Sequence, residues 1–131
     1  MNHEAELAKL IVPAKRSRFS EMLKSKKKRR KLVDSLYHYR DLDRRFIVPI
    51  PKNNHTAKDI GNILRKLGAP ETCHIISTIS EIDGKECDLQ ETLHSIVGAE
   101  EGTLLSCIPG VLGYYEGESE GDRYILKRTA A

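Results

Sequence analysis

The sequence is poor in aromatic residues. It has no Trp, two Phe and five Tyr among 131 residues. The core must therefore be built mainly from Leu, Ile and Val, and a chain of this length fits one domain with a single modest core. Hydrophobic residues make up 39% of the chain and charged residues 31%, which is typical of a globular rather than a disordered protein.

Long apolar runs and paired cysteines are also absent. No stretch approaches the ~20 apolar residues that a membrane-spanning helix needs. The N-terminus lacks the charged-then-apolar order of a signal peptide. Cys73, Cys87 and Cys107 are an odd number with no paired spacing, which argues against a disulfide scaffold and indicates a reducing compartment. We therefore expect a soluble, cytoplasmic protein with no membrane partner.

The basic residues gather in one part of the chain. Residues 15–45 hold 13 Lys or Arg and four Asp or Glu, a net charge of +9. Residues 46–131 hold eight basic and 13 acidic residues, a net charge of −5. Such asymmetry is typical of chains that bind polyanions or self-associate. We expect a single domain over residues 1–131, with a basic helical arm at 1–45 and an α+β core at 46–128.

The arm is expected to be helical. Residues 1–12 are amphipathic, with Pro13 ending that segment or starting the next. Residues 13–39 read as helical in two pieces, because the run KSKKKRRK at 24–31 has no apolar position. We place the break near Ser25, whose hydroxyl can cap the second helix.

The core alternates helices and strands. Apolar periodicity and β-branched runs predict strands at 46–50 and 72–79 and helices at 57–67 and 89–97. Thr56 and Asp88 precede the two helices as N-caps. Pro49 places the first strand at a sheet edge or ends it early. Asp83 and Gly84 predict a tight turn.

The strongest strand signal lies near the C-terminus. Apolar runs at 104–108 and 111–115 flank Pro109-Gly110, and a third run follows at 123–127. We expect a three-stranded meander, with a bulge or a close backbone approach at Gly113. The fold class is then α+β: a small antiparallel or mixed sheet with the core helices on one face.

The basic run is the first candidate site. The residues expected to contact phosphates are Lys15, Arg16, Arg18, Lys24, Lys26, Lys27, Lys28, Arg29, Arg30 and Lys31. Such contacts give salt-dependent, sequence-independent affinity for nucleic acid. Tyr37, His38 and Tyr39 follow and could stack on unpaired bases. The alternative is a solvated helix that pairs with the acidic remainder of this chain or of a second copy.

The second candidate is the stretch YHYRDLDRR at 37–45, and its expected ligand residues are His38, Arg40, Asp41, Asp43 and Arg44. A His beside carboxylates can act as a general base, and arginines can bind an anionic substrate. The alternative is ordinary chemistry at a helix end, where cations suit the helix dipole and Asp favours turns.

Metal and cofactor motifs give no positive signal. The acidic residues Glu81, Asp83, Glu86 and Asp88 are dense enough for Mg²⁺ or Ca²⁺, but their spacing fits no calcium loop. The cysteines show no CxxC spacing, and the chain has no phosphate-binding P-loop and no dinucleotide GxGxxG. We expect no metal, no cofactor and no assigned catalytic residue.

Three functions follow from these observations, in order of preference. The first is a small non-enzymatic binding protein whose basic arm contacts RNA or DNA. The second is a protein-interaction or regulatory subunit, whose arm docks on an acidic partner or on another copy in a homo-oligomer. The third is a small enzyme that uses residues 37–45, with His38, Asp41 and Asp43 as the first residues to test.

Overall fold

The computed structural model describes residues 2–51 and 53–128. Its α-helices are α1 (His3–Leu7), α2 (Arg16–Lys24), α3 (Lys26–Ser35), α4 (Ala57–Lys66) and α5 (Leu89–Ile96). Its strands are β1 (Ile47–Pro49), β2 (Thr72–Ser77), β3 (Glu86–Asp88), β4 (Thr103–Ile108), β5 (Leu112–Glu116) and β6 (Arg123–Lys127). Short 3₁₀ turns are η1 (Ala8–Leu10), η2 (Pro13–Lys15), η3 (Leu36–His38) and η4 (Arg44–Phe46). Residues 1, 52 and 129–131 of the predicted domain lie outside the described residues.

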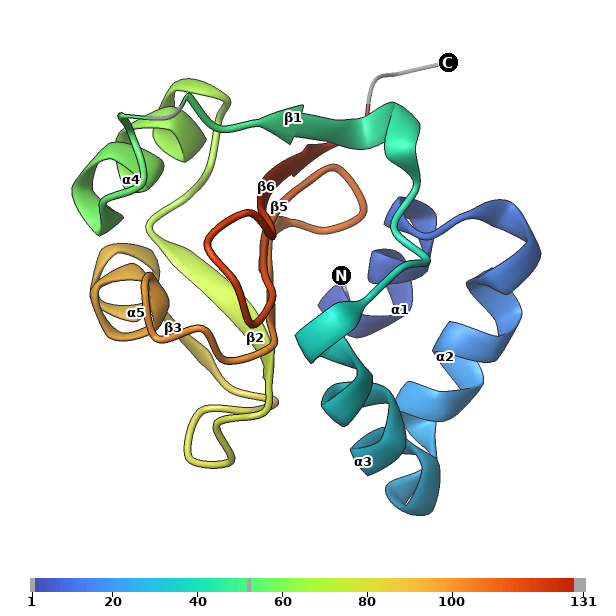
Figure 1. Cartoon of the computed structure of the whole chain (residues 1–131). Helices are drawn as coiled ribbons and strands as arrows, with labels where there is room; N and C mark the ends of the chain where they lie inside the picture. Colours follow the sequence, from blue (N-terminus) through green and yellow to red (C-terminus); the bar gives the residue numbers. More distant parts are fainter. Residues whose placement is uncertain (1, 52, 129–131) are drawn as a thin grey trace.

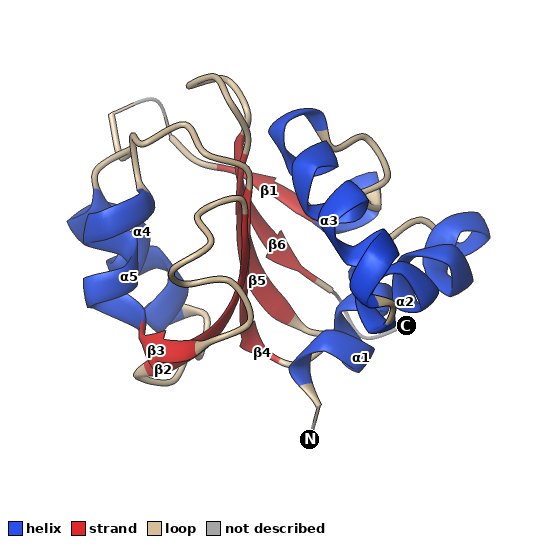
Figure 2. Cartoon of the chain, turned by 90° about the horizontal axis from the view of Figure 1, so that it is seen from below, coloured by secondary structure: helices blue, strands red, loops and turns tan. Residues whose placement is uncertain are grey.

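The strands form one antiparallel sheet in the order β1–β6–β5–β4–β2–β3. The predicted α+β class and the C-terminal meander of β4, β5 and β6 are confirmed. β1 lies at one edge, as Pro49 predicts, and the short strand β3, which the sequence did not indicate, forms the other edge. Helices lie on both sides of the sheet, so the molecule has three layers (Figures 1 and 2).

One layer consists of α4 and α5, the two helices predicted to cover the sheet. Ile60 and Leu64 of α4 and Leu93 of α5 are fully buried. They belong to one apolar cluster with Ile75 of β2 and Leu105 of β4. The apolar stripes read from the sequence therefore face the sheet as amphipathic helices do.

The opposite layer is the basic arm, which packs on the sheet through its own apolar stripe. Leu7, Phe19 and Leu36 are buried in a second cluster with Leu104 and Tyr115 of the sheet. Both faces of β4 and β5 are thus covered, which explains why these strands are apolar without alternation. The apolar side of the arm is used for packing, and its charged side faces outward.

Three helices begin at the predicted N-caps. Ser25, Thr56 and Asp88 each accept a hydrogen bond from the backbone N–H three residues later, at 3.2, 3.1 and 2.9 Å. Ser25 has extended backbone angles, so the chain breaks between α2 and α3 where the sequence predicts. This break turns the basic run into a helical hairpin.

The meander depends on two glycines. Gly110, in the turn after β4, has a φ of +71°, which disfavours other residues. The register between β4 and β5 shifts near Ser106 and Ile108. Opposite the shift, a Cβ at Gly113 would lie 2.3 Å from the Leu105 carbonyl oxygen. The predicted bulge or close backbone approach at Gly113 is confirmed.

Candidate nucleic-acid interface

The outward side of the arm carries cations that no carboxylate neutralises. α2 and α3 lie side by side, and η2 leads into α2 (Figure 1). Within residues 15–31, seven exposed basic side chains have no carboxylate of the described part of the chain at ion-pair distance: Lys15, Arg18, Lys24, Lys26, Lys27, Lys28 and Lys31. All but Lys15 come from one helical hairpin, so their positive charges add over a small surface.

Arg29 has a different environment from its neighbours in the basic run. Its guanidinium donates to both oxygens of Glu4, at 2.7 and 3.1 Å, and to both oxygens of Asp83, at 3.2 and 3.1 Å. Burial alone would raise the pKa of Glu4, but hydrogen bonds from His74 and Arg29 outweigh it and lower that pKa to about 2. Arg29 therefore joins α3 to α1 and to the turn after β2, and its charge is compensated within the fold.

Arg16 and Arg30 are also paired. The Arg16 Nε donates to the Ile11 carbonyl oxygen at 2.9 Å, and a terminal nitrogen lies 4.0 Å from Asp43. Arg30 pairs with Asp34 one turn later, at 3.3 Å, with both side chains exposed. An exposed pair of this kind is weak and can open to a phosphate. Of the ten predicted phosphate contacts, Arg29 is the residue least available to an external anion.

A hollow of about 190 Å³ lies between α2 and α3, and we call it the helix hollow. Its cations are Lys15, Arg18 and Lys31, and the other lining residues are Phe19, Met22, Leu32, Ser35, Tyr39 and Asp41. Three cations and one carboxylate thus line the hollow with apolar and aromatic side chains, of which Phe19, Met22 and Leu32 are buried and Tyr39 is partly exposed. The sequence placed these cations in one run but gave no indication that the hairpin brings Lys31 next to Lys15 and Arg18.

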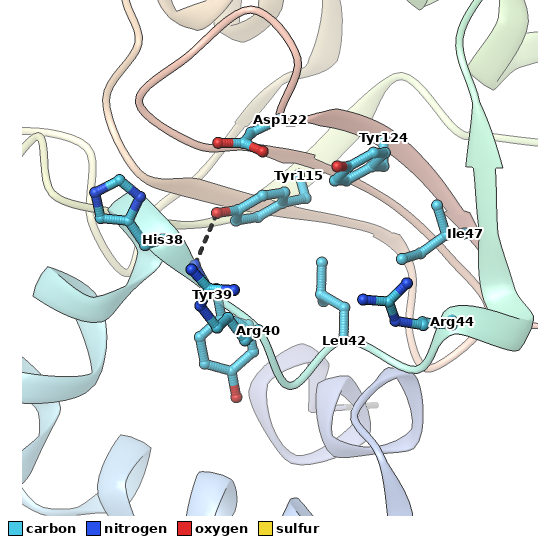
Figure 3. Close-up of a pocket in the computed structure, with 9 residues that line it drawn as sticks. All are labelled: His38, Tyr39, Arg40, Leu42, Arg44, Ile47, Tyr115, Asp122 and Tyr124. Atoms are coloured by element: carbon cyan, nitrogen blue, oxygen red, sulfur yellow. Dashed lines mark hydrogen bonds between the residues drawn. The ribbon is translucent and has the colours of Figure 1, made fainter.

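A larger cavity of about 460 Å³, the strand cavity, lies between the segment after α3 and the ends of β5 and β6 (Figure 3). It is lined by His38, Tyr39, Arg40, Leu42, Arg44, Ile47, Tyr115, Asp122 and Tyr124. Tyr39 lines both this cavity and the helix hollow, so the two concave sites adjoin. In Figure 3 the Tyr39 ring points away from Tyr115, which agrees with the position of Tyr39 between the strand cavity and the helix hollow.

Hydrogen bonds fix the wall between the cavity and the arm. The Tyr115 hydroxyl donates to the Leu36 carbonyl oxygen at 2.6 Å and accepts from the Tyr39 backbone N–H at 3.1 Å. Burial raises the pKa of Tyr115 to about 12, so it stays a neutral donor. At the rim, His38 Nε2 lies 3.0 Å from Glu118, and both side chains are more than half exposed. These contacts join η3 to β5 and to the turn that precedes β6.

The five residues of the second sequence-based site divide between different environments. His38, Arg40 and Arg44 line the strand cavity, whereas Asp41 lines the helix hollow. Asp43 lines neither site: it is 4% exposed and accepts hydrogen bonds from Arg45, the shortest at 2.7 Å. Those bonds lower the pKa of Asp43. No hydrogen bond or ion pair within the described residues joins His38 to Asp41 or Asp43, and the carboxylate beside His38 is that of Glu118.

Sequence reasoning missed the contribution of the meander to the strand cavity. Tyr115 and Tyr124 are cross-strand partners in the β5–β6 register, and Asp122 immediately precedes β6. A hairpin of β5 and β6 in the correct register would have predicted that these two tyrosines are neighbours. Their position against residues 38–44 could not be read from the chain, because it depends on how the arm packs on the sheet.

Comparison with known proteins adds no family. The chain matches no protein family, no curated protein and no solved structure.

Two residues of the predicted acidic cluster, Asp83 and Asp88, have structural roles. Asp83 accepts from Arg29 and from the Ser77 backbone N–H, and Asp88 caps α5. No group of three or more His, Cys, Asp or Glu within the described residues is arranged to hold a metal ion. Burial raises the pKa of Cys73 to about 12, which makes its thiolate scarce at neutral pH. No helix in the described part of the chain is long and apolar enough to cross a membrane.

Proposed function

We propose that this protein binds single-stranded RNA or DNA through the outward side of the α2–α3 hairpin. The observation that carries the proposal is the helix hollow, whose lining joins three cations, Lys15, Arg18 and Lys31, to the partly exposed ring of Tyr39. Cations placed around an aromatic surface are the combination that single-strand binding proteins use, with phosphates on the cations and bases on the rings.

The charge distribution supports the same proposal. Displacing counterions from the strand requires cations that are not already neutralised within the protein. The free lysines of α3 extend the positive surface beyond the helix hollow. Residues 46–131 have a net charge of −5, so the attraction for a polyanion is confined to the arm. The acidic remainder would repel a strand from the other faces and favour one orientation of binding.

The proposal is tested by removing the three cations of the helix hollow. We expect the triple variant Lys15→Gln, Arg18→Gln, Lys31→Gln to bind a short, fluorescently labelled single-stranded RNA about tenfold or more weakly than the wild type, measured by anisotropy at low salt. The matched control is Lys58→Gln, Lys66→Gln, Lys85→Gln, which removes the same charge from exposed lysines outside the arm. This control should keep most of the affinity.

Further probes separate this function from the alternatives. A single-stranded DNA of the same sequence should bind comparably, and a blunt duplex more weakly, since its bases are not free to stack. Polyglutamate of similar charge should bind more weakly still. If both triple variants lose affinity equally, or if polyglutamate binds as well as RNA, the attraction is nonspecific and docking on an acidic protein becomes the better account.

A further inference from the structure

The strand cavity contains two arginines that the fold does not use. Arg40 and Arg44 are exposed, and neither has a carboxylate at ion-pair distance within the described residues. The adjacent Arg45 shows the contrast, because Asp43 holds it at 2.7 Å and it lies 5.0 Å above the Phe46 ring. Arg45 is therefore held by Asp43, whereas Arg44 lines the cavity and its guanidinium has no carboxylate partner within the described residues.

Two aromatic rings form the opposite wall of the cavity. Tyr115 and Tyr124 lie nearly parallel, with an interplanar angle of 8° and ring centroids 6.1 Å apart. Tyr115 is fixed by its hydrogen bonds to η3, so the wall is ordered before any ligand arrives. Both residues line the cavity beside apolar Leu42 and Ile47 (Figure 3). Tyr115 is buried and Tyr124 is partly exposed, so Tyr124 offers the accessible ring against which a planar group can pack.

Asp122 places one acceptor in the same cavity. One of its carboxylate oxygens accepts from the Ser119 hydroxyl at 3.0 Å, and its backbone N–H donates to the Ser119 carbonyl oxygen. The turn thus holds the side chain at the mouth, where Figure 3 shows it beside Tyr124 and across from the segment that carries Arg40. The cavity combines two guanidinium groups, a planar apolar wall and one carboxylate acceptor.

We propose that the strand cavity binds a nucleoside monophosphate group. Its phosphate is held by Arg40 and Arg44, its base lies against Tyr124, and a hydroxyl or amino group donates to Asp122. Arginine suits phosphate because its planar fork can make two parallel hydrogen bonds. The volume of about 460 Å³ is in the usual range for a small-molecule site, and phosphate alone would leave most of it empty. The group can come from a free nucleotide or from the phosphorylated end of a strand; the second source rests on the proposed function.

The first experiment is a calorimetric titration with adenosine monophosphate, adenosine and inorganic phosphate. Adenosine monophosphate is expected to bind about tenfold or more tightly than either fragment, because it engages both the arginines and the aromatic wall. The variant Arg40→Gln, Arg44→Gln should reduce its affinity to about that of adenosine. The charge-matched variant Lys58→Gln, Lys66→Gln should bind as the wild type does. Equal affinity for adenosine monophosphate and phosphate, or an unchanged affinity in the arginine variant, overturns the proposal.

A second measurement places the ligand without mutation. Amide chemical shifts of the wild type should change on titration with adenosine monophosphate at Arg40, Arg44, Asp122 and Tyr124. Shifts confined to α2 and α3 would place the nucleotide on the basic hairpin instead and would also overturn the proposal. Arg40 and Arg44 are exposed, so we expect the Arg40→Gln, Arg44→Gln variant to fold. Its amide spectrum in the absence of ligand checks this.

Two oligonucleotides distinguish the source of the nucleotide and separate this proposal from the proposed function. A strand with a terminal phosphate should bind more tightly than the same strand without one, and the arginine variant should abolish that difference. The arginine variant should retain binding of the unphosphorylated strand, which depends on the helix hollow. If adenosine monophosphate binds but neither strand does, the cavity takes a free nucleotide and the proposed function fails. If both strands bind equally and adenosine monophosphate does not bind, the cavity proposal alone fails.

Discussion

Arg29 provides a strong test of how the arm is attached to the sheet. We expect Arg29→Gln to lower the free energy of unfolding by about 2–3 kcal/mol. The guanidinium makes four hydrogen bonds to two carboxylates, and bonds to charged groups contribute about 1.5–3 kcal/mol each in isolation. These four bonds are not additive, because Arg29, Glu4 and Asp83 are each 21–24% exposed and solvent screens the charges that remain. The value therefore lies near the contribution of a single strong bond.

The assay is urea unfolding followed by circular dichroism, with Lys28→Gln as the neighbouring control. Lys28 is exposed and unpaired within the described residues, so its substitution should change stability by less than about 0.5 kcal/mol. In RNA binding the order should be reversed: Lys28→Gln should weaken affinity more than Arg29→Gln, because the charge of Lys28 is not paired within the described residues. If Arg29→Gln is as stable as the wild type, or weakens RNA binding more than Lys28→Gln does, Arg29 does not hold the arm on the sheet as described.

Three further predictions concern stability. The pKa of Glu4 is about 2 in the folded state against an ordinary 4.5, so the unfolded state binds more protons between those pH values. Stability is therefore lost as pH falls from about 4.5 towards 2, by about 1–2 kcal/mol after screening by solvent. Glu4→Gln should remove this part of the pH dependence in acid unfolding curves. Gly113→Ala should destabilise the meander by about 1–3 kcal/mol in urea unfolding, because its Cβ would meet the Leu105 carbonyl oxygen, and unchanged stability would contradict the close approach. Ser25→Ala should cost about 1 kcal/mol through loss of the α3 cap, measured in the same way, whereas Ser25→Asp should retain the cap.

The parts of the fold that depend on local chemistry could be predicted from the sequence. Ser25, Thr56 and Asp88 act on backbone groups three residues away, so their capping role is visible without any knowledge of the tertiary structure. The meander is similarly local, because short turns join its strands. The turn at Gly84 was predicted but β3 after it was not, because a strand of three residues is too short to show an apolar pattern of its own.

The placement of the arm and of the candidate sites required the tertiary structure. The apolar run at 104–108 indicates a strand that is covered on both faces, and β4 is indeed buried along most of its length. No local feature of the sequence indicates that the basic arm supplies the second layer. Charge pairing was equally hidden: Arg29 is separated by 25 residues from Glu4 and by 54 from Asp83. The stretch at 37–45 was found as a region, yet packing rather than sequence placed Arg44 in the cavity and buried Asp43, which pairs with the exposed Arg45.

The salt dependence of RNA binding shows whether the unneutralised cations of the arm contact the strand. The association constant for a short single-stranded RNA should be measured between about 50 and about 200 mM salt. Each phosphate contact to a single strand contributes about 0.7 to the slope of log affinity against log salt, so three to six contacts predict a slope of about −2 to −4. The triple variant Lys15→Gln, Arg18→Gln, Lys31→Gln should reduce the magnitude of that slope by about 2, whereas Lys58→Gln, Lys66→Gln, Lys85→Gln should leave it unchanged. Affinity that does not depend on salt, or a slope that the first variant does not alter, would contradict binding through the unneutralised cations of the arm.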